Sequence, residues 1–251
     1  MANTVERFSN RVENYVKYRP DYPPEVLRLF RSEMNLQTSS IVADIGAGTG
    51  ISTRLFLENG NPVCAVEPNA AMRDAAAIFL KDYRKLTLVE GTSENTTLEK
   101  DSVDFIIAAQ AFHWFKPTET RAEFKRILKN GGSVALIWNE RQLAATAFLS
   151  GYERLLIEYG TDYEAIRHDN ITAETLRDFF QTDFQQAVFQ NKQTVDFDGL
   201  KGRMMSASYV PSAENPRFPA MVKNLELLFA EHAENGRIDI LYDTKIFYGQ
   251  I

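Results

Sequence analysis

Cysteine, histidine and long apolar runs are scarce in this chain of 251 residues, and each scarcity excludes a class of protein. The single cysteine, Cys64, cannot form an intrachain disulfide, which favours a reducing compartment, and we expect a cytoplasmic protein. With three histidines and one cysteine, no cluster has the spacing of metal ligands, so we expect no metal. No window approaches about 18 consecutive apolar residues, and the polar N-terminus lacks the apolar core of a secretory signal. We therefore expect neither a membrane span nor export.

Basic residues are outnumbered by acidic ones. Lys and Arg total 28 against 34 Asp and Glu, which gives a formal net charge of −6 without any basic run. This balance argues against a nucleic-acid backbone or an anionic membrane as the main partner. The hydrophobic fraction of 44% and the length are enough for one sizeable core and exclude a disordered chain.

Strand-like and helix-like segments alternate through the first 138 residues. Short apolar runs predict strands at 41–45, 63–66, 86–89, 103–108 and 133–138. Helical patterns follow a pair of prolines at 23–24 and then recur at 51–58, 69–81 and 118–129. Strands and helices at this spacing predict a parallel sheet with helices on both faces.

The alternation stops after Trp138. The remaining chain looks mostly helical at 140–183, strand-like at 184–197, irregular and then helical at 199–235, and strand-like again at 238–248. Two late strands joined by a helical insert predict an antiparallel pair at one edge of the sheet.

We therefore predict a Rossmann-like, doubly wound α/β fold with seven strands, mostly parallel, and a helical cap. Four segments follow from this pattern: an N-terminal arm or lid with its helix (1–37), a cofactor-binding core (38–139), a helical insertion (140–183), and a C-terminal segment that completes the sheet (184–251).

A glycine-rich segment, Asp44-Ile-Gly-Ala-Gly-Thr-Gly50, joins the first predicted strand to the next helix. Gly46 and Gly48 permit a tight turn and the close approach of a ligand, beside the N-terminus of a helix. Glu67 ends the following strand, 23 residues after Asp44, where a carboxylate of a doubly wound fold binds ribose hydroxyls. The pattern predicts a nucleoside-containing ligand.

The spacing of the glycines distinguishes between nucleoside cofactors. The dinucleotide fingerprint G-x-G-x-x-G would need a third glycine at the position of Ile51. Asp44, two residues before the first glycine, would repel a pyrophosphate and suits a ligand that bears an ammonium group. S-adenosylmethionine combines an adenosine, a sulfonium and an amino-acid end. A nicotinamide-dependent oxidoreductase and a non-catalytic S-adenosylmethionine-binding module stay as alternatives.

Four segments, in this order, resemble the cofactor motifs of class I S-adenosylmethionine-dependent methyltransferases. They are the glycine-rich segment, Val66-Glu-Pro-Asn69 with Met72, Gly91-Thr-Ser-Glu94, and Ala109-Gln-Ala-Phe-His-Trp-Phe115. The arm Tyr18-Arg-Pro-Asp-Tyr22, the pair His113-Trp114 and the run 242–249 resemble the subgroup that contains trans-aconitate methyltransferases. Thr92 departs from the family pattern, in which many members carry Asp, and Ala47 stands where many carry Cys.

The resemblance implies a set of cofactor contacts. Asp44 and the loop residues Gly46, Ala47 and Gly48 would hold the amino-acid end, and Glu67 would bind the ribose hydroxyls. The other implied contacts are Pro68 and Met72 on the adenine, Thr92, Ser93 and Glu94 at its border, and Ala109 and Gln110 below the sulfonium.

The acceptor side has fewer signals. His113 follows the fourth strand, at the edge of the sheet where ligands bind, and is the candidate catalytic base, although a loop hydrogen bond alone would also explain it. Arg19 is expected to pair with the cofactor carboxylate or with an acidic substrate. The candidate substrate residues are Tyr18, Trp114, Arg141 and Arg203.

Several arginines near the expected pocket mouth favour an anionic acceptor, because a buried carboxylate needs a cationic partner. A carboxylate is also deprotonated at neutral pH and needs no general base. The sequence therefore predicts a methyltransferase for a small molecule, with O-methylation of a carboxylic acid as the acceptor chemistry.

Overall fold

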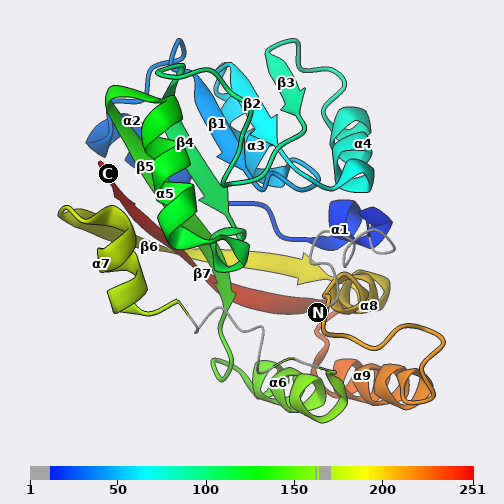
Figure 1. Cartoon of the computed structure of the whole chain (residues 1–251). Coiled ribbons are helices and arrows are strands. Elements are labelled where there is room, and N and C mark those ends of the chain that lie inside the picture. Colours follow the sequence, from blue (N-terminus) through cyan, green and yellow to red (C-terminus); the bar gives the residue numbers. More distant parts are fainter. Residues whose placement is uncertain (1–11, 162, 164–170) are drawn as a thin grey trace.

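The computed structural model describes residues 12–161, 163 and 171–251. Its centre is a seven-stranded sheet with the strand order β3-β2-β1-β4-β5-β7-β6 (Figure 1). The strands are β1 (Val42–Ile45), β2 (Val63–Val66), β3 (Leu86–Val89), β4 (Val103–Ala109), β5 (Leu128–Arg141), β6 (Phe184–Val195) and β7 (Ile238–Gly249). The first five strands pair in parallel, and β7 runs antiparallel to both β5 and β6. The predicted fold class is confirmed.

The helices between the parallel strands follow local sequence signals. They are α3 (Ile51–Glu58), α4 (Ala70–Phe79) and α5 (Pro117–Ile127). Asn69 caps α4, since its side chain accepts a hydrogen bond of 3.1 Å from the backbone of Met72. The fifth strand begins earlier than predicted, because Leu128 already pairs with Val103. The helix before it therefore ends at Ile127 and not at residue 129.

Apolar side chains cover both faces of the sheet. On one face, α2 (Glu25–Glu33) and α3 pack through residues such as Phe30 and Phe56. On the other face, α5 and α7 (Ala173–Phe180) contribute Phe124 and Phe179. Strands that are buried on both sides need apolar residues throughout, and all four residues of β1 are buried.

A third apolar cluster lies beside the antiparallel edge. It is formed by α6 (Ala147–Tyr159), α8 (Phe197–Met205) and α9 (Phe218–His232), packed against the first residues of β7. Figure 1 shows α6 and α9 side by side beyond the ends of β6 and β7. The segment predicted as irregular from residue 199 is instead helical to Met205. No helix in the described ranges is long and apolar enough to cross a membrane.

The N-terminal arm packs between two parts of the molecule. Its helix α1 (Val12–Tyr18) contacts α4 of the parallel half and α8 of the C-terminal segment (Figure 1). Side chains of the sheet bind the arm's backbone: Gln193 donates to the carbonyl of Tyr18 at 2.9 Å, and Asn191 donates to that of Asp21 at 2.7 Å. The predicted arm also includes residues 1–11, which lie outside the described residues.

Candidate functional site

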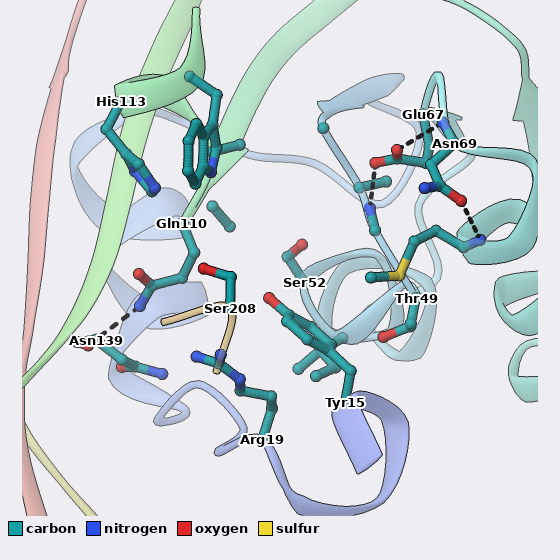
Figure 2. Close-up of a pocket in the computed structure, with 18 of the residues that line it drawn as sticks. Tyr15, Arg19, Thr49, Ser52, Glu67, Asn69, Gln110, His113, Asn139 and Ser208 are labelled. Atoms are coloured by element: carbon teal, nitrogen blue, oxygen red, sulfur yellow. Dashed lines mark hydrogen bonds between the residues drawn. The ribbon is translucent and has the colours of Figure 1, made fainter. Parts of the chain in front are cut away.

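A cavity of about 500 Å³ lies at the carboxyl ends of the parallel strands, a size typical of small-molecule sites. Figure 2 shows its two walls, with Thr49, Glu67 and Asn69 on one side and His113 and Asn139 on the other. The first wall comes from the loops after β1 and β2, and the second from the segment after β4 and the end of β5. The edge of the sheet predicted to bind a ligand therefore carries the cavity.

The glycine loop after β1 forms part of the cavity wall. Gly46 adopts a φ of +71° and Gly48 a φ of +57°, both in the left-handed region that favours glycine. A Cβ atom at Gly46 would lie 2.7 Å from the Cβ of Ala111, whereas one at Gly48 would meet nothing within 4 Å. The loop therefore packs tightly against the residue after β4 at Gly46 and leaves open space over Gly48. Ala47 also lines the cavity.

Glu67 connects this loop to the start of α4. Its two carboxylate oxygens accept hydrogen bonds of 2.9 Å from the backbone N–H groups of Gly48 and Asn69. Burial raises the pKa of Glu67, although these two bonds and Arg73 oppose the rise. Glu67 lines the cavity as expected, and each oxygen keeps a lone pair for a ligand hydroxyl.

Asp44 lies behind the loop and not in the cavity wall, which differs from its expected direct contact with a ligand. Its side chain is fully buried, and one oxygen accepts hydrogen bonds from Ser52 at 2.7 Å and Thr53 at 2.6 Å. The reason is its position in β1, which turns the carboxylate toward the first turn of α3. Ser52 does line the cavity, so Asp44 can act on a ligand through that hydroxyl.

Burial raises the pKa of Asp44 from 3.8 to about 6. The hydrogen bonds from Thr53 and Ser52 oppose this rise, and the charge of Glu67 adds to it. The folded protein thus binds this proton more tightly than the unfolded chain does, and folding stability falls as pH rises between these values. Because of Asp44, we expect the free energy of unfolding to fall by about 1–2 kcal/mol between pH 5 and pH 7.5, and we expect this fall to be absent in Asp44→Asn. Urea unfolding at both pH values measures it. The exposed Asp74→Asn is the control, and an unchanged pH slope in Asp44→Asn would contradict the assignment.

The segment after β3 and the start of α4 form the far end of the first wall. All of the residues expected near an adenine line the cavity: Pro68, Met72, Thr92, Ser93 and Glu94. Ser93 is held from behind by Thr120, which donates to it at 3.1 Å, and Glu94 accepts from the backbone of Lys116 at 3.2 Å. These bonds hold this part of the wall in place and leave the surface that faces the cavity available to a ligand.

The end of β4 supplies the second wall. Ala109 and Gln110 line the cavity, and Gln110 has a φ of +57°, a conformation that is costly for a residue other than glycine. Two bonds hold it there: its backbone N–H donates to Ile137 at 2.8 Å and its side chain donates to the carbonyl of Asn139 at 3.1 Å (Figure 2). The strained backbone directs the following residues around the rim.

His113 and Trp114 both line the cavity, as expected. They belong to the short helix η2 (Phe112–Trp114), and their ring centroids are 4.8 Å apart. Phe112 anchors this turn in the core, with its ring centroid 4.7 Å from that of Phe179. Because Phe112 points inward, the next two side chains face the cavity.

Three arginines line the cavity, and their partners differ. Arg141 binds the carboxylate of Glu153 and donates to the hydroxyl of Tyr163 at 3.1 Å. Arg203 is 8% exposed and donates through Nε to the hydroxyl of Tyr242 at 3.3 Å. Arg19 donates to a backbone carbonyl of the segment after α8. Within the described residues, Arg141 is thus the one arginine of the three whose charge an acidic side chain balances.

Tyr18, which was expected to contact a substrate, does not line this cavity. Its ring packs against Gly202 of α8, where an added Cβ would lie 2.1 Å from the ring. Tyr15 and Arg19, four residues apart on one face of the arm, line the cavity instead. Three other lining residues were not selected from the sequence: Ser52, Asn139 and Tyr163.

No group of three or more His, Cys, Asp or Glu side chains among the described residues is arranged to hold a metal ion. His168 lies outside those residues. The wall chemistry is that of a cavity for a polar organic ligand, with a carboxylate and backbone N–H groups at one end and arginines at the other.

Comparison with known proteins finds a family match in the region around the glycine loop. Residues 43–136 match the family model described as a methyltransferase domain. An uncharacterised methyltransferase of Mycobacterium tuberculosis is 37% identical over 134 residues, which are 53% of this chain and 52% of that protein. The chain thus spans about half the length of the curated relatives it matches.

Solved structures extend the likeness of the fold to nearly the whole chain. A protein assigned as a type II methyltransferase from Anaeromyxobacter dehalogenans has a TM-score of 0.65 at 18% identity, covering 93% of this chain and 98% of that one. A phosphoethanolamine N-methyltransferase of Haemonchus contortus, solved with S-adenosylhomocysteine, has a TM-score of 0.55 at 14% identity, covering 97% of this chain and 57% of that one. At these identities the likeness concerns the fold.

Proposed function

We propose that this chain, whose residues 43–136 match a methyltransferase domain, is a class I methyltransferase that transfers a methyl group from S-adenosylmethionine to a small molecule. The observation that supports this proposal is the cavity at the carboxyl edge of that domain, where the buried carboxylate of Glu67 is bonded to the glycine loop. The family match favours methyl transfer over a nicotinamide-dependent oxidoreductase, because it covers the glycine motif itself. A non-catalytic module that binds the same cofactor is the remaining alternative.

The residues present fit the cofactor. The open space over Gly48 and the lone pairs of Glu67 suit a nucleoside with ribose hydroxyls. Gly46 to Gly48, with Ser52 supported by Asp44, would hold the amino-acid end. Pro68 and Met72 would pack on the adenine beside Thr92, Ser93 and Glu94, while Ala109 and Gln110 would lie below the sulfonium.

When bound, S-adenosylmethionine supplies a methyl group on a sulfonium that is already a good leaving group. The protein therefore has to align the acceptor and exclude water, which are general contributions to catalysis. Trp114 and the arm residue Tyr15 line the cavity and would serve this exclusion.

For the acceptor we propose a small carboxylic acid, methylated on oxygen. A carboxylate is ionised at neutral pH and needs no general base. Its burial requires cations, and three arginines line the acceptor side of the cavity. The experiment is a screen of metabolite extracts with cofactor labelled in the methyl group, followed by identification of the labelled product. Binding of S-adenosylhomocysteine without any labelled product would support the non-catalytic module.

The acceptor chemistry can be tested at His113. With a carboxylate acceptor, His113→Ala is expected to lower kcat less than about tenfold, because no proton has to be removed. A loss of about 10²-fold or more, recovered at high pH, would instead indicate a hydroxyl or amine acceptor with His113 as its base. The pH profile of kcat, measured on the product found by the screen, distinguishes the two results.

A further inference from the structure

Two of the three cavity arginines lack an acidic partner. Among the residues that the structure describes, neither Arg19 nor Arg203 forms an ion pair, whereas Arg141 is paired with Glu153. The Nε–H group of Arg19 is buried and has no hydrogen-bond acceptor within the described ranges. A buried N–H without an acceptor is costly, so a ligand that accepts from it would be favoured.

These two arginines come from distant segments that meet at the cavity. Arg19 follows α1 and donates 3.1 Å to the carbonyl of Ser206, three residues after Arg203 on α8. Figure 2 shows the Arg19 side chain rising from the arm into the cavity toward Ser208. Burial, and then the positive charge of Arg203, lower the pKa of Arg19. Because Arg19 binds the backbone three residues after Arg203 and both side chains line the same cavity, the two cations share one site.

Among the described residues, the side chains that contact this pair are aromatic. Arg19 stacks 4.7 Å from the ring centroid of Tyr15, and Arg203 bonds to the hydroxyl of Tyr242. Neither contact carries a full negative charge at neutral pH. Like charges in a partly desolvated site are unfavourable, and an anion placed between them changes repulsion into two charge-assisted contacts.

We infer that Arg19 and Arg203 together form a subsite for an oxyanion, the carboxylate or phosphate group of the methyl acceptor. This inference rests on the proposed function and deepens it, since it selects two of the three arginines. Arg141 also has a buried nitrogen, Nη1, without an acceptor in the described ranges, but it is excluded because Glu153 already balances its charge. The subsite forms only where the arm meets α8, so both segments are needed for acceptor binding.

The test uses small anions as probes of the full-length protein. Malonate and inorganic phosphate are titrated by calorimetry, with and without S-adenosylhomocysteine, and malonamide serves as a neutral match for malonate. We expect one of the anions to bind and malonamide not to bind. Arg19→Met and Arg203→Met should each weaken anion binding about tenfold or more, whereas the exposed Arg237→Met should not.

Several outcomes would overturn the subsite. Equal binding of malonamide would show that charge is not recognised, and unchanged anion affinity in Arg203→Met would remove that residue. If Arg19→Met weakens S-adenosylhomocysteine but not the anion, Arg19 belongs to the cofactor. Arg203→Lys, which keeps the charge, provides a second variant should Arg203→Met fail to fold. Anion binding without cofactor tests the subsite even if the protein binds no S-adenosylhomocysteine, the result that would refute the proposed function.

Discussion

Glu67→Gln is expected to weaken the binding of S-adenosylhomocysteine about 10- to 100-fold, the largest loss we expect from a single side chain in the cavity. The carboxylate accepts from two backbone N–H groups, those of Gly48 and Asn69, with one oxygen each. Glutamine has one acceptor oxygen, so its amide nitrogen must face one of these donors. The substitution therefore disturbs the glycine loop and also removes an ionised acceptor for ribose hydroxyls.

Calorimetry with S-adenosylhomocysteine measures this effect, and the exposed Glu99→Gln is the matched control. Thermal unfolding without the cofactor shows whether the variant folds. An affinity within about twofold of that of the unchanged protein would be a difference well below about 1.4 kcal/mol, the value that corresponds to tenfold. This result would place the ribose elsewhere and would remove the main support for the cofactor position.

The parallel half of the sheet could be predicted from the sequence because its signals are local. Each strand there contains a short apolar run, and the turns after β1, β2 and β3 carry a glycine or a capping residue, as with Asn69 before α4. The cofactor side of the cavity follows for the same reason. Its residues lie within a few positions of strand ends, and the ends of parallel strands meet at one edge.

The helix α8 shows why the rest could not be predicted. Two glycines, Gly199 and Gly202, lower its intrinsic helix propensity. Tertiary contacts oppose this: Asp196 caps the helix by accepting 2.8 Å from the backbone of Gly199, and Gly202 provides room for the ring of Tyr18. Both effects depend on the fold, and the second depends on a residue 184 positions away in the sequence.

The acceptor side of the cavity has the same difficulty. It is assembled from the arm, the end of β5 and α8, and the bond from Arg19 to Ser206 joins residues 187 positions apart. Arginines can be chosen as candidates from the sequence, but which of them has an acidic partner depends on Glu153, a residue with no motif around it. The choice between Tyr15 and Tyr18 likewise depends on how α1 is rotated against α8.

Gly46→Ala is expected to destabilise the fold by about 2–5 kcal/mol and to lower its melting temperature by about 5–15 °C. The first contribution is the φ of +71°, which costs a residue with a Cβ about 1–2 kcal/mol. The second is a contact of 2.7 Å between the new Cβ and that of Ala111. That atom is attached directly to the backbone, so the loop or the segment after β4 must move. Cofactor affinity should fall as well, since Gly48 and Ala111 both line the cavity.

Two further variants separate these contributions. Gly131→Ala has a similar φ of +79° with nothing within 4 Å of the added Cβ, so it measures the backbone cost alone. In Gly46→Ala combined with Ala111→Gly, the contact is absent while the φ is kept, and we expect stability to recover to about the level of Gly131→Ala. If the double variant is no more stable than Gly46→Ala, the contact with Ala111 does not cause the loss of stability at position 46. The strain would then reside in the backbone of the glycine loop itself.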